Sequence, residues 1–175
     1  MNYTPNTQML WRTLVISLLL AAATAVADDG ESEVHVQPEM TFPADGHWHH
    51  YFDTTEGEPG KLNPGLARAA AFLETMQEAG VSADRLKVAV VIHGPPVYDV
   101  STAARYAEQY GDVINPNQQV IAGLISAGAE IWVCGVSARY RKVGNDDLLP
   151  GVKMAYSAMT ANAELQRRGY SLNPY

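Results

Sequence analysis

The sequence predicts an α/β fold in which a mainly parallel β-sheet is covered by helices on both faces. The first observation behind this prediction is a repeated plan: an Asn-Pro pair, a stripe of apolar residues at helical spacing, a glycine, and then a short apolar run. The second is residues 86–94, whose β-branched side chains are typical of a strand buried on both faces. Strands that alternate with helices in this way are joined by right-handed crossovers and pair in parallel.

The N-terminal residues 1–27 have the parts of a secretory signal peptide. Arg12 is the only charged side chain before Asp28, residues 14–23 are almost wholly apolar, and residues 25–27 (Ala-Val-Ala) match a small-x-small cleavage site. The apolar run is shorter than the roughly 20 residues that a transmembrane helix needs. We therefore expect cleavage after this site and a periplasmic or secreted mature protein that does not associate with a membrane. An uncleaved N-terminal anchor is the alternative.

The remaining chain is predicted to be one acidic domain behind a linker. Residues 28–45 are acidic, contain two prolines and show no sustained period, so we expect a flexible lead-in before a single domain at residues 46–175. The chain of 175 residues carries a net charge of −7, which argues against nucleic acid or an anionic membrane surface as its main partner. Its single cysteine, Cys134, excludes an intramolecular disulfide and a zinc site built from several cysteines.

The first strand–helix–strand unit begins with an aromatic-rich segment, residues 47–53, which we expect to be a strand. Asn63-Pro64 then supplies an N-cap and a proline at the first helical position, and Gly80 ends the helix. The apolar stripe of this helix consists of Leu62, Leu66, Ala69, Leu73 and Met76. The next strand is predicted at residues 86–94.

The second unit repeats this order. Residues 101–110 are expected to form a short helix capped by Asp99 or Ser101. Residues 115–118 (Asn-Pro-Asn-Gln) supply an N-cap, a proline at the first position and a capping-box glutamine for a longer helix. The buried stripe of that helix consists of Val120, Ile121, Leu124 and Ile125. A glycine ends it, and the following strand is predicted at residues 129–135.

A last strand at residues 151–157 and a helix at residues 160–168 complete the predicted domain. The adjacent Asp146 and Asp147 before them are typical of a turn rather than of an acid–base pair. Several catalytic and phosphate-binding motifs are missing from the sequence, namely HExxH, GxSxG, GxxxxGK[ST], and GxGxxG after a strand.

Reactive side chains followed by glycine end two of the predicted strands: His93-Gly94 and Cys134-Gly135. Ligands and reactive groups of open α/β sheets gather at the carboxyl ends of the strands, and glycine lets the chain turn there without crowding the site. If the two strands are neighbours, His93 and Cys134 open onto the same edge. This placement follows from topology rather than from local spacing.

Cys134 is the best candidate for a reactive group. A thiol reacts as its thiolate, and positive charge or a helix N-terminus lowers the pKa of a thiol. Arg139, Arg141 and Lys142 form the densest basic cluster of the chain directly after it, so Arg139 or Arg141 is expected to stabilise the anion. His93 is expected to orient a substrate or transfer a proton. The alternatives are an inert buried cysteine and a histidine bonded to backbone.

Four of the five histidines lie between residues 35 and 50, which raises the question of metal binding. On an extended strand His47, His49 and Asp53 share one face and are candidate ligands for Zn²⁺ or Cu²⁺, whereas His50 faces the other side. A polar strand or an exposed sheet edge explains the same residues, and we do not assign a metal site.

The second half of the chain resembles the DsrE/DsrF-like family, in its exported branch. The resemblance covers about residues 86–170 and rests on motifs that appear in order. These are His93-Gly94, the helix start at 115–117, residues 124–128 and 131–135 with Cys134, residues 147–152, Ser157-Ala158 and residues 165–170. It implies a three-layer α/β/α domain that assembles as a homo-oligomer, a trimer or hexamer. It also implies a persulfide on Cys134, passed between partners without a metal or organic cofactor.

Two classes of function therefore remain open at the level of sequence. The first is an exported sulfur carrier, a sulfurtransferase-like thiol relay through Cys134, whose partners are a donor or acceptor protein or a small thiol. Because the chain has no second cysteine to resolve a persulfide, transfer would be intermolecular. The second is a non-catalytic oligomeric module that binds a small ligand at the carboxyl edge, or a metal through His35, His47, His49 and His50.

Overall fold

The computed structural model describes residues 35–174, so the predicted signal peptide lies outside the described residues. The described part of the predicted lead-in, residues 35–45, contains no helix or strand. The elements that follow are β1 (Trp48–Thr54), α1 (Pro64–Glu78), β2 (Leu86–Ile92), α2 (Ala103–Tyr110), α3 (Gln118–Ser126), β3 (Glu130–Cys134), α4 (Gly135–Tyr140), β4 (Val152–Ala155), α5 (Ala158–Arg167) and β5 (Ser171–Asn173). Short 3₁₀ helices lie at Ala83–Arg85, Pro95–Val100 and Asn145–Asp147.

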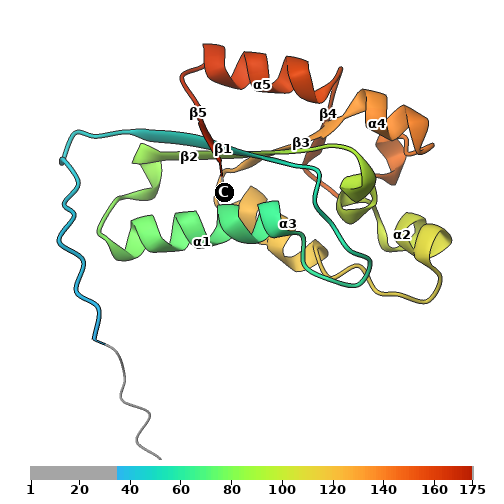
Figure 1. Cartoon of the computed structure of the whole chain (residues 1–175), viewed down its shortest axis with the longest axis horizontal. Coiled ribbons are helices and arrows are strands. Elements are labelled where there is room, and N and C mark those ends of the chain that lie inside the picture. The colour runs from blue at the N-terminus through green and yellow to red at the C-terminus, as the bar shows by residue number, and fades with distance from the viewer. Residues whose placement is uncertain (1–34, 175) are drawn as a thin grey trace, which may run out of the picture. The chain divides into compact units, whose positions relative to one another are not determined.

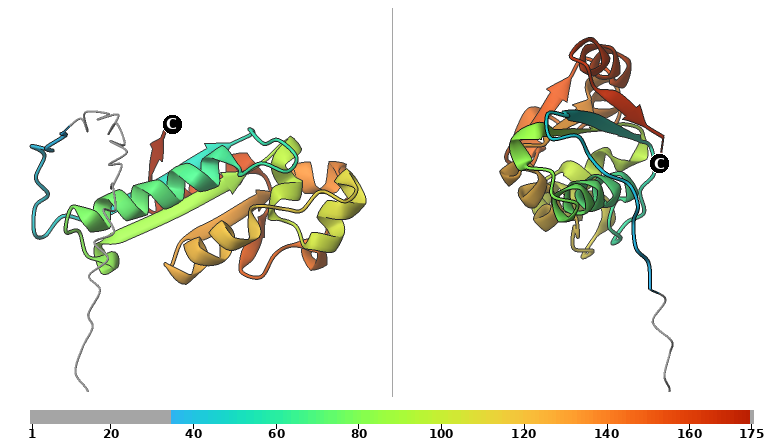
Figure 2. Two further views of the ribbon diagram at one scale, coloured as in Figure 1. Left: turned by 90° about the horizontal axis from the view of Figure 1, so that it is seen from below. Right: turned by 90° about the vertical axis from the view of Figure 1, so that its left-hand side faces the viewer.

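The five strands form one sheet in the order β4-β3-β2-β1-β5, and every pairing is parallel. Because β4 and β5 lie at opposite edges, α5, which connects them, must cross the sheet. Figure 1 shows α5 on one face and α1 and α3 on the other, and Figure 2 shows the same layers from two further sides. The predicted α/β fold with helices on both faces of a parallel sheet is therefore confirmed.

The larger core lies between the sheet and the helices α1 and α3. Apolar side chains at helical spacing face the sheet, and those of β2 and β3 at alternate positions face the helices. Its buried members include Leu66, Leu73, Met76, Val88, Val90, Ile92, Ile121, Leu124, Ile131 and Val133. One residue of the predicted stripe differs: Leu62 precedes the helix and is 45% exposed, because the Asn63 cap ends the helical geometry there.

The second core lies between the sheet and α5 and is built from smaller side chains. Its buried members are Tyr51, Ala89, Val91, Cys134, Ala158, Ala161, Leu165 and Tyr170. Alanines at the α5 positions that face the sheet let the helix lie close to the strands. Cys134 is therefore a core residue on the α5 face, at the carboxyl end of β3.

The helix starts agree with prediction at α1 and differ at α2 and α3. The Asn63 side chain accepts hydrogen bonds from the backbone N–H groups of the first turn of α1, as expected. The cap of α2 is Thr102 rather than Asp99 or Ser101, which are buried next to it. The helix α3 begins later than predicted, because the Asn115 side chain accepts the backbone N–H of Asn117 and holds residues 115–117 in a turn.

Among the α-helices and strands, two short elements have no counterpart in the prediction from the sequence, and the 3₁₀ helices have none either. The helix α4 is six residues long and β5 is three residues long, and neither is long enough to show a hydrophobic period. Both depend on tertiary contacts, since α4 continues directly from β3 and β5 pairs with β1. No helix within residues 35–174 is long and apolar enough to cross a membrane.

Candidate functional site

The site lies where three neighbouring strands end on the α5 face of the sheet. Ile92 of β2 pairs with Val133 of β3, so the next residues of each strand, His93 and Cys134, follow side by side. On the other side of β2, Asp53 of β1 pairs with Val91. Since side chains alternate along a strand, Asp53, His93 and Cys134 lie on one face, with Asp53 level with Val91, two residues before His93.

The Cys134 thiol is nearly enclosed, with 5% of the residue exposed, at the N-cap of α4. Burial alone would raise its pKa, because the thiolate loses solvation. Hydrogen bonds to the sulfur outweigh that effect. The Ser137 hydroxyl and the backbone N–H groups of Ser137, Ala158 and Val136 donate to it, and the pKa of Cys134 is lowered overall. Thus the thiolate is stabilised by amides of two elements, α4 and the first residue of α5.

Gly135 allows these two elements to meet. A Cβ atom at this position would lie 2.5 Å from the carbonyl oxygen of Ala155 and 3.1 Å from that of Tyr156. Any other residue would push the turn before α5 away from Cys134 and remove the amide of Ala158 from the sulfur. Gly135 is therefore needed not only for a sharp turn, as predicted, but also because it allows two chain segments to approach closely.

Gly94 connects the end of β2 to the thiol. Its φ of +71° is in the region that favours glycine, and its backbone N–H donates to the Ser137 Oγ at 3.0 Å. Because that hydroxyl oxygen accepts from Gly94, its own hydrogen is directed elsewhere and is donated to Cys134. Ser137 is not among the site residues predicted from the sequence. Its position three residues after Cys134, at the third residue of a helix, is the signal that would have indicated it.

His93 is held by a carboxylate from β1 rather than by backbone alone. Its Nε2 lies 2.8 Å from the Asp53 Oδ1, and the second oxygen of Asp53 accepts a 2.6 Å hydrogen bond from the Asn162 amide of α5. The side chains of His93 and Asp53 are 30% and 23% exposed. The backbone N–H of His93 donates to the Thr54 carbonyl at 3.1 Å. Three elements thus fix the imidazole at a solvent-accessible position.

The two predicted arginines take different positions. Arg139 is exposed on α4. The Arg141 guanidinium lies over the Tyr98 ring, 5.9 Å from its centroid, while its carbonyl accepts from the Tyr98 hydroxyl and from Arg105. Neither arginine is among the groups that lower the pKa of Cys134. In this structure backbone amides and Ser137 hold the thiolate.

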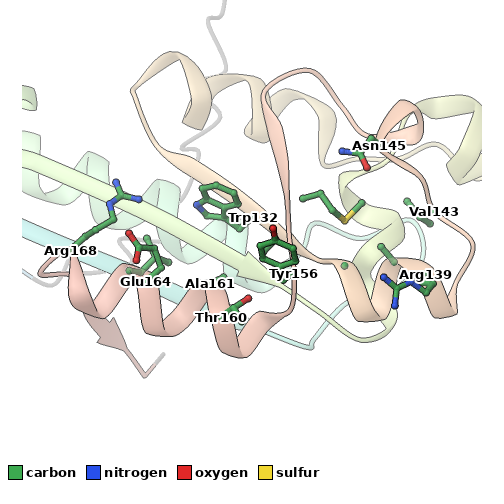
Figure 3. Close-up of a pocket in the computed structure, with 14 residues that line it drawn as sticks. Trp132, Arg139, Val143, Asn145, Tyr156, Thr160, Ala161, Glu164 and Arg168 are labelled. Carbon is green, nitrogen blue, oxygen red and sulfur yellow. The ribbon is translucent and has the colours of Figure 1, made fainter.

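A pocket of about 890 Å³ lies beside Cys134 at the β4 edge of the sheet. The pocket is lined by Gly135, which follows Cys134, by Ala155, its partner on β4, and by Ala161 of the same core, but not by Cys134 itself. Figure 3 shows two aromatic side chains of this pocket, Trp132 of β3 and Tyr156 just before α5, and it shows Arg139 on α4. The acidic side chain in its wall, Glu164, is paired with an arginine of the same helix. The pocket gives a small molecule room next to the enclosed thiol.

The predicted metal ligands are not brought together. The imidazole of His49 lies against Tyr170, with ring centroids 5.4 Å apart, and that of His50 lies against Phe72 on the other face. Asp53 is bonded to His93 and Asn162 instead. Within the part of the chain that the structure describes, no three His, Cys, Asp or Glu side chains form a group that would hold a metal ion.

The fold and the site define an α/β protein with an all-parallel five-stranded sheet and a single thiol at the carboxyl end of an interior strand, β3. The DsrE/DsrF-like family model matches residues 49–174, and the chain belongs to that family. A solved structure, that of the protein of unknown function MTH1491 from Methanobacterium thermoautotrophicum, is similar, with 17% identity and a TM-score of 0.46 over 74% of this chain and 98% of the other. No curated protein matches the chain.

Proposed function

We propose that this protein is an exported sulfur carrier in which Cys134 takes up a sulfane sulfur as a persulfide and passes it on. The observation that carries this proposal is the set of four hydrogen-bond donors around the buried Cys134 sulfur, which lower the pKa of the thiol despite its burial. An inert core cysteine has its pKa raised by burial, whereas this thiol meets four donors at its sulfur. Membership of the DsrE/DsrF-like family supports the same reading.

The reaction is a thiol exchange that balances without a cofactor. The Cys134 thiolate attacks the outer sulfur of a donor persulfide, R–S–SH, and a new S–S bond forms as the S–S bond of the donor breaks. The donor leaves as a thiolate and takes up the proton that the Cys134 thiol lost. The products are the persulfide of Cys134 and the donor thiol, so no external oxidant or reductant is consumed.

Both donor and acceptor are separate molecules in this proposal, because the chain has one cysteine. The two segments that hold Cys134 carry large exposed apolar side chains, which suit contact with a partner protein or a second copy. These are Val136, Tyr140, Tyr156 and Met159. We assign Arg139, which is exposed on α4 and lines the neighbouring pocket, to the negative charge of the donor thiolate that leaves. A homo-oligomer, trimer or hexamer, is part of the proposal on family grounds.

The burial of Cys134 limits the access of a donor molecule to its sulfur. Only 5% of Cys134 is exposed, and the backbone N–H of Ala158 is bonded to its sulfur, so a donor sulfur has little room to approach while this contact is in place. Residues 155–158 form the turn between β4 and α5, and Tyr156 at its tip is 92% exposed. We propose that a small displacement of this turn opens the thiol. We also propose that the reaction takes place in the periplasm or outside the cell, which is supported by the signal-peptide pattern of residues 1–27.

Thiol reactivity and intact mass test the proposal on the purified protein. On exposure to a small persulfide donor, we expect a mass gain of one sulfur that Cys134→Ser abolishes. The rate of alkylation by iodoacetamide should rise with pH around a midpoint below the ordinary cysteine value. A folded protein that is inert toward iodoacetamide near pH 7 and gains no sulfur would overturn the proposal.

A further inference from the structure

The contact between His93 and Asp53 is too exposed to contribute much to the stability of the fold. A partly exposed contact between a carboxylate and an imidazole contributes at most about 1 kcal/mol, because solvent competes with it and the side chains lose freedom. At 30% and 23% exposure the pair belongs to that class. Yet three separate segments take part: Asp53 belongs to β1, His93 directly follows β2, and Asn162 belongs to α5. The Asn162 amide donates a hydrogen bond of 2.6 Å to the second carboxylate oxygen of Asp53. Such an arrangement restricts the orientation of an imidazole more than it stabilises the fold.

The geometry also determines which ring nitrogen is available. The Asp53 carboxylate accepts a hydrogen bond only if His93 carries a proton on Nε2, and this tautomer leaves Nδ1 as the acceptor. His93 and Cys134 follow the paired residues Ile92 and Val133, so they are neighbours across two parallel strands on the α5 face. The thiol, the imidazole and the carboxylate thus correspond to the nucleophile, the base and the orienting group of sites that activate a nucleophile in this way.

We propose that Asp53, held by Asn162, positions His93 as the proton-transfer group for Cys134. His93 accepts the thiol proton on Nδ1, and the resulting imidazolium is stabilised by the Asp53 carboxylate. After the new S–S bond forms and the donor S–S bond breaks, the same proton passes from Nδ1 to the leaving thiolate of the donor. Protons and electrons balance within the exchange. The inference rests on the proposed sulfur-carrier function, and it adds Asp53 and Asn162 as positioning residues.

The test uses two persulfide donors that differ in their leaving group, and iodoacetamide as a third reagent. An alkyl persulfide releases a basic thiolate that needs a proton, whereas an aryl persulfide releases a weakly basic thiolate that needs little assistance. Iodoacetamide reports the thiolate alone, because iodide leaves without a proton. Rates are measured on the full-length protein by intact mass, for the wild type and for the variants His93→Gln, Asp53→Asn and Asn162→Ala.

We expect His93→Gln to slow transfer from the alkyl donor by about a hundredfold and from the aryl donor by no more than a few-fold. Asp53→Asn should give the same selective loss at about tenfold, and Asn162→Ala a smaller one in the same direction. His49→Gln is the matched control, since His49 lies on the same face of β1 but contacts Tyr170, and both donors should react with it at the wild-type rate.

The outcomes separate this inference from the function on which it rests. If the wild type takes no sulfur from either donor, the carrier function itself fails. If the wild type takes sulfur but the variants slow both donors and iodoacetamide equally, the cluster is only structural and the inference is overturned. Circular dichroism and the urea midpoint of each variant show whether a uniform loss comes from unfolding. A selective loss with the alkyl donor supports the inference.

Discussion

Two hydrogen-bonded pairs of asparagine and aspartate lie near the carboxyl edge of the sheet. The donor and acceptor atoms are the same in both pairs, but the roles of the pairs differ. On the side of α1, the Asn63 Nδ2 donates to the Asp99 Oδ2 at 2.9 Å. On the side of α5, the Asn162 Nδ2 donates to the Asp53 Oδ2 at 2.6 Å. Asn63 and Asp99 are 0% and 2% exposed, whereas the Asp53 side chain is 23% exposed. Burial, rather than the hydrogen bond, separates the two pairs.

The buried pair belongs to a closed network. The Asn63 backbone N–H donates to the Asn117 side chain at 2.7 Å, and the Asn115 amide donates to the carbonyls of Asp99 and Ser101. These contacts tie the starts of α1 and α3 together. The pair on the α5 side ends instead at the imidazole of His93. Polar residues at the carboxyl edge of a sheet thus indicate a reactive site only where solvent or a partner reaches them.

Among the substitutions that test the difference between the two pairs, we expect Asn63→Ala to have the largest effect on the free energy of unfolding. The substitution Asn63→Ala removes the cap of α1 and leaves the buried Asp99 carboxylate without its side-chain donor. Loss of a cap costs about 1 kcal/mol and loss of a donor to a buried charged group about 3 kcal/mol more, so the free energy of unfolding should fall by about 4 kcal/mol. Urea denaturation near pH 7 measures it. A loss below about 1 kcal/mol would contradict a structural role for the network.

The next effect concerns Asp99 and pH. Burial raises the pKa of Asp99 to about 6, from an ordinary value of 3.8, against the opposing hydrogen bond from Asn63. The folded state therefore binds this proton more tightly than the unfolded state, and the cost of ionisation, up to about 3 kcal/mol, is present above pH 6 and removed as the pH falls toward 4.

The substitution Asp99→Asn tests that sign. Above pH 6 the variant should be more stable than the wild type, and the difference should shrink toward pH 4, as followed by urea denaturation across this range. Glu130, whose pKa its hydrogen bond with Arg168 keeps below the usual range, affects both proteins alike and cancels in the difference. A difference that does not vary with pH would show that Asp99 does not titrate in this window.

A smaller effect is expected at the thiol itself. The substitution Ser137→Ala removes the hydroxyl that donates to Cys134, so the pKa of the thiol should rise. A higher pKa leaves less thiolate near pH 7, so iodoacetamide should react more slowly, by up to about tenfold. Ser82→Ala, at the opposite end of β2, is the control and should leave the rate unchanged. An unchanged rate in Ser137→Ala would remove the hydroxyl from the site.

The smallest effect is the counterpart of the first. The substitution Asn162→Ala removes a donor from a solvent-accessible carboxylate, and water replaces it at little cost. We expect the free energy of unfolding to change by less than about 0.5 kcal/mol, measured under the conditions used for Asn63→Ala. A loss comparable to that of Asn63→Ala would mean that both pairs hold the fold together, and the contrast between them would be wrong.

Much of the fold could be predicted because its signals are local. The Asn63-Pro64 helix start, the stripe of α1 and the β-branched run of β2 each depend on neighbouring residues. The short α4 and β5 could not be predicted, since six and three residues are too few to carry a period. The two predicted caps of α2, Asp99 and Ser101, were wrong, because both are buried by contacts that the sequence does not show and Thr102 is the cap instead.

For the site, the sequence alone determined which reactive groups exist and that each ends a strand: His93 before Gly94, and Cys134 before Gly135. Only the tertiary structure decided their chemistry. The partner of His93 comes from β1, and an amide that holds the Cys134 sulfur comes from α5. These contacts join residues far apart in the chain, and the strand order and the close packing at Gly135 bring them together. Solvation and hydrogen bonding set a pKa, and both depend on that packing.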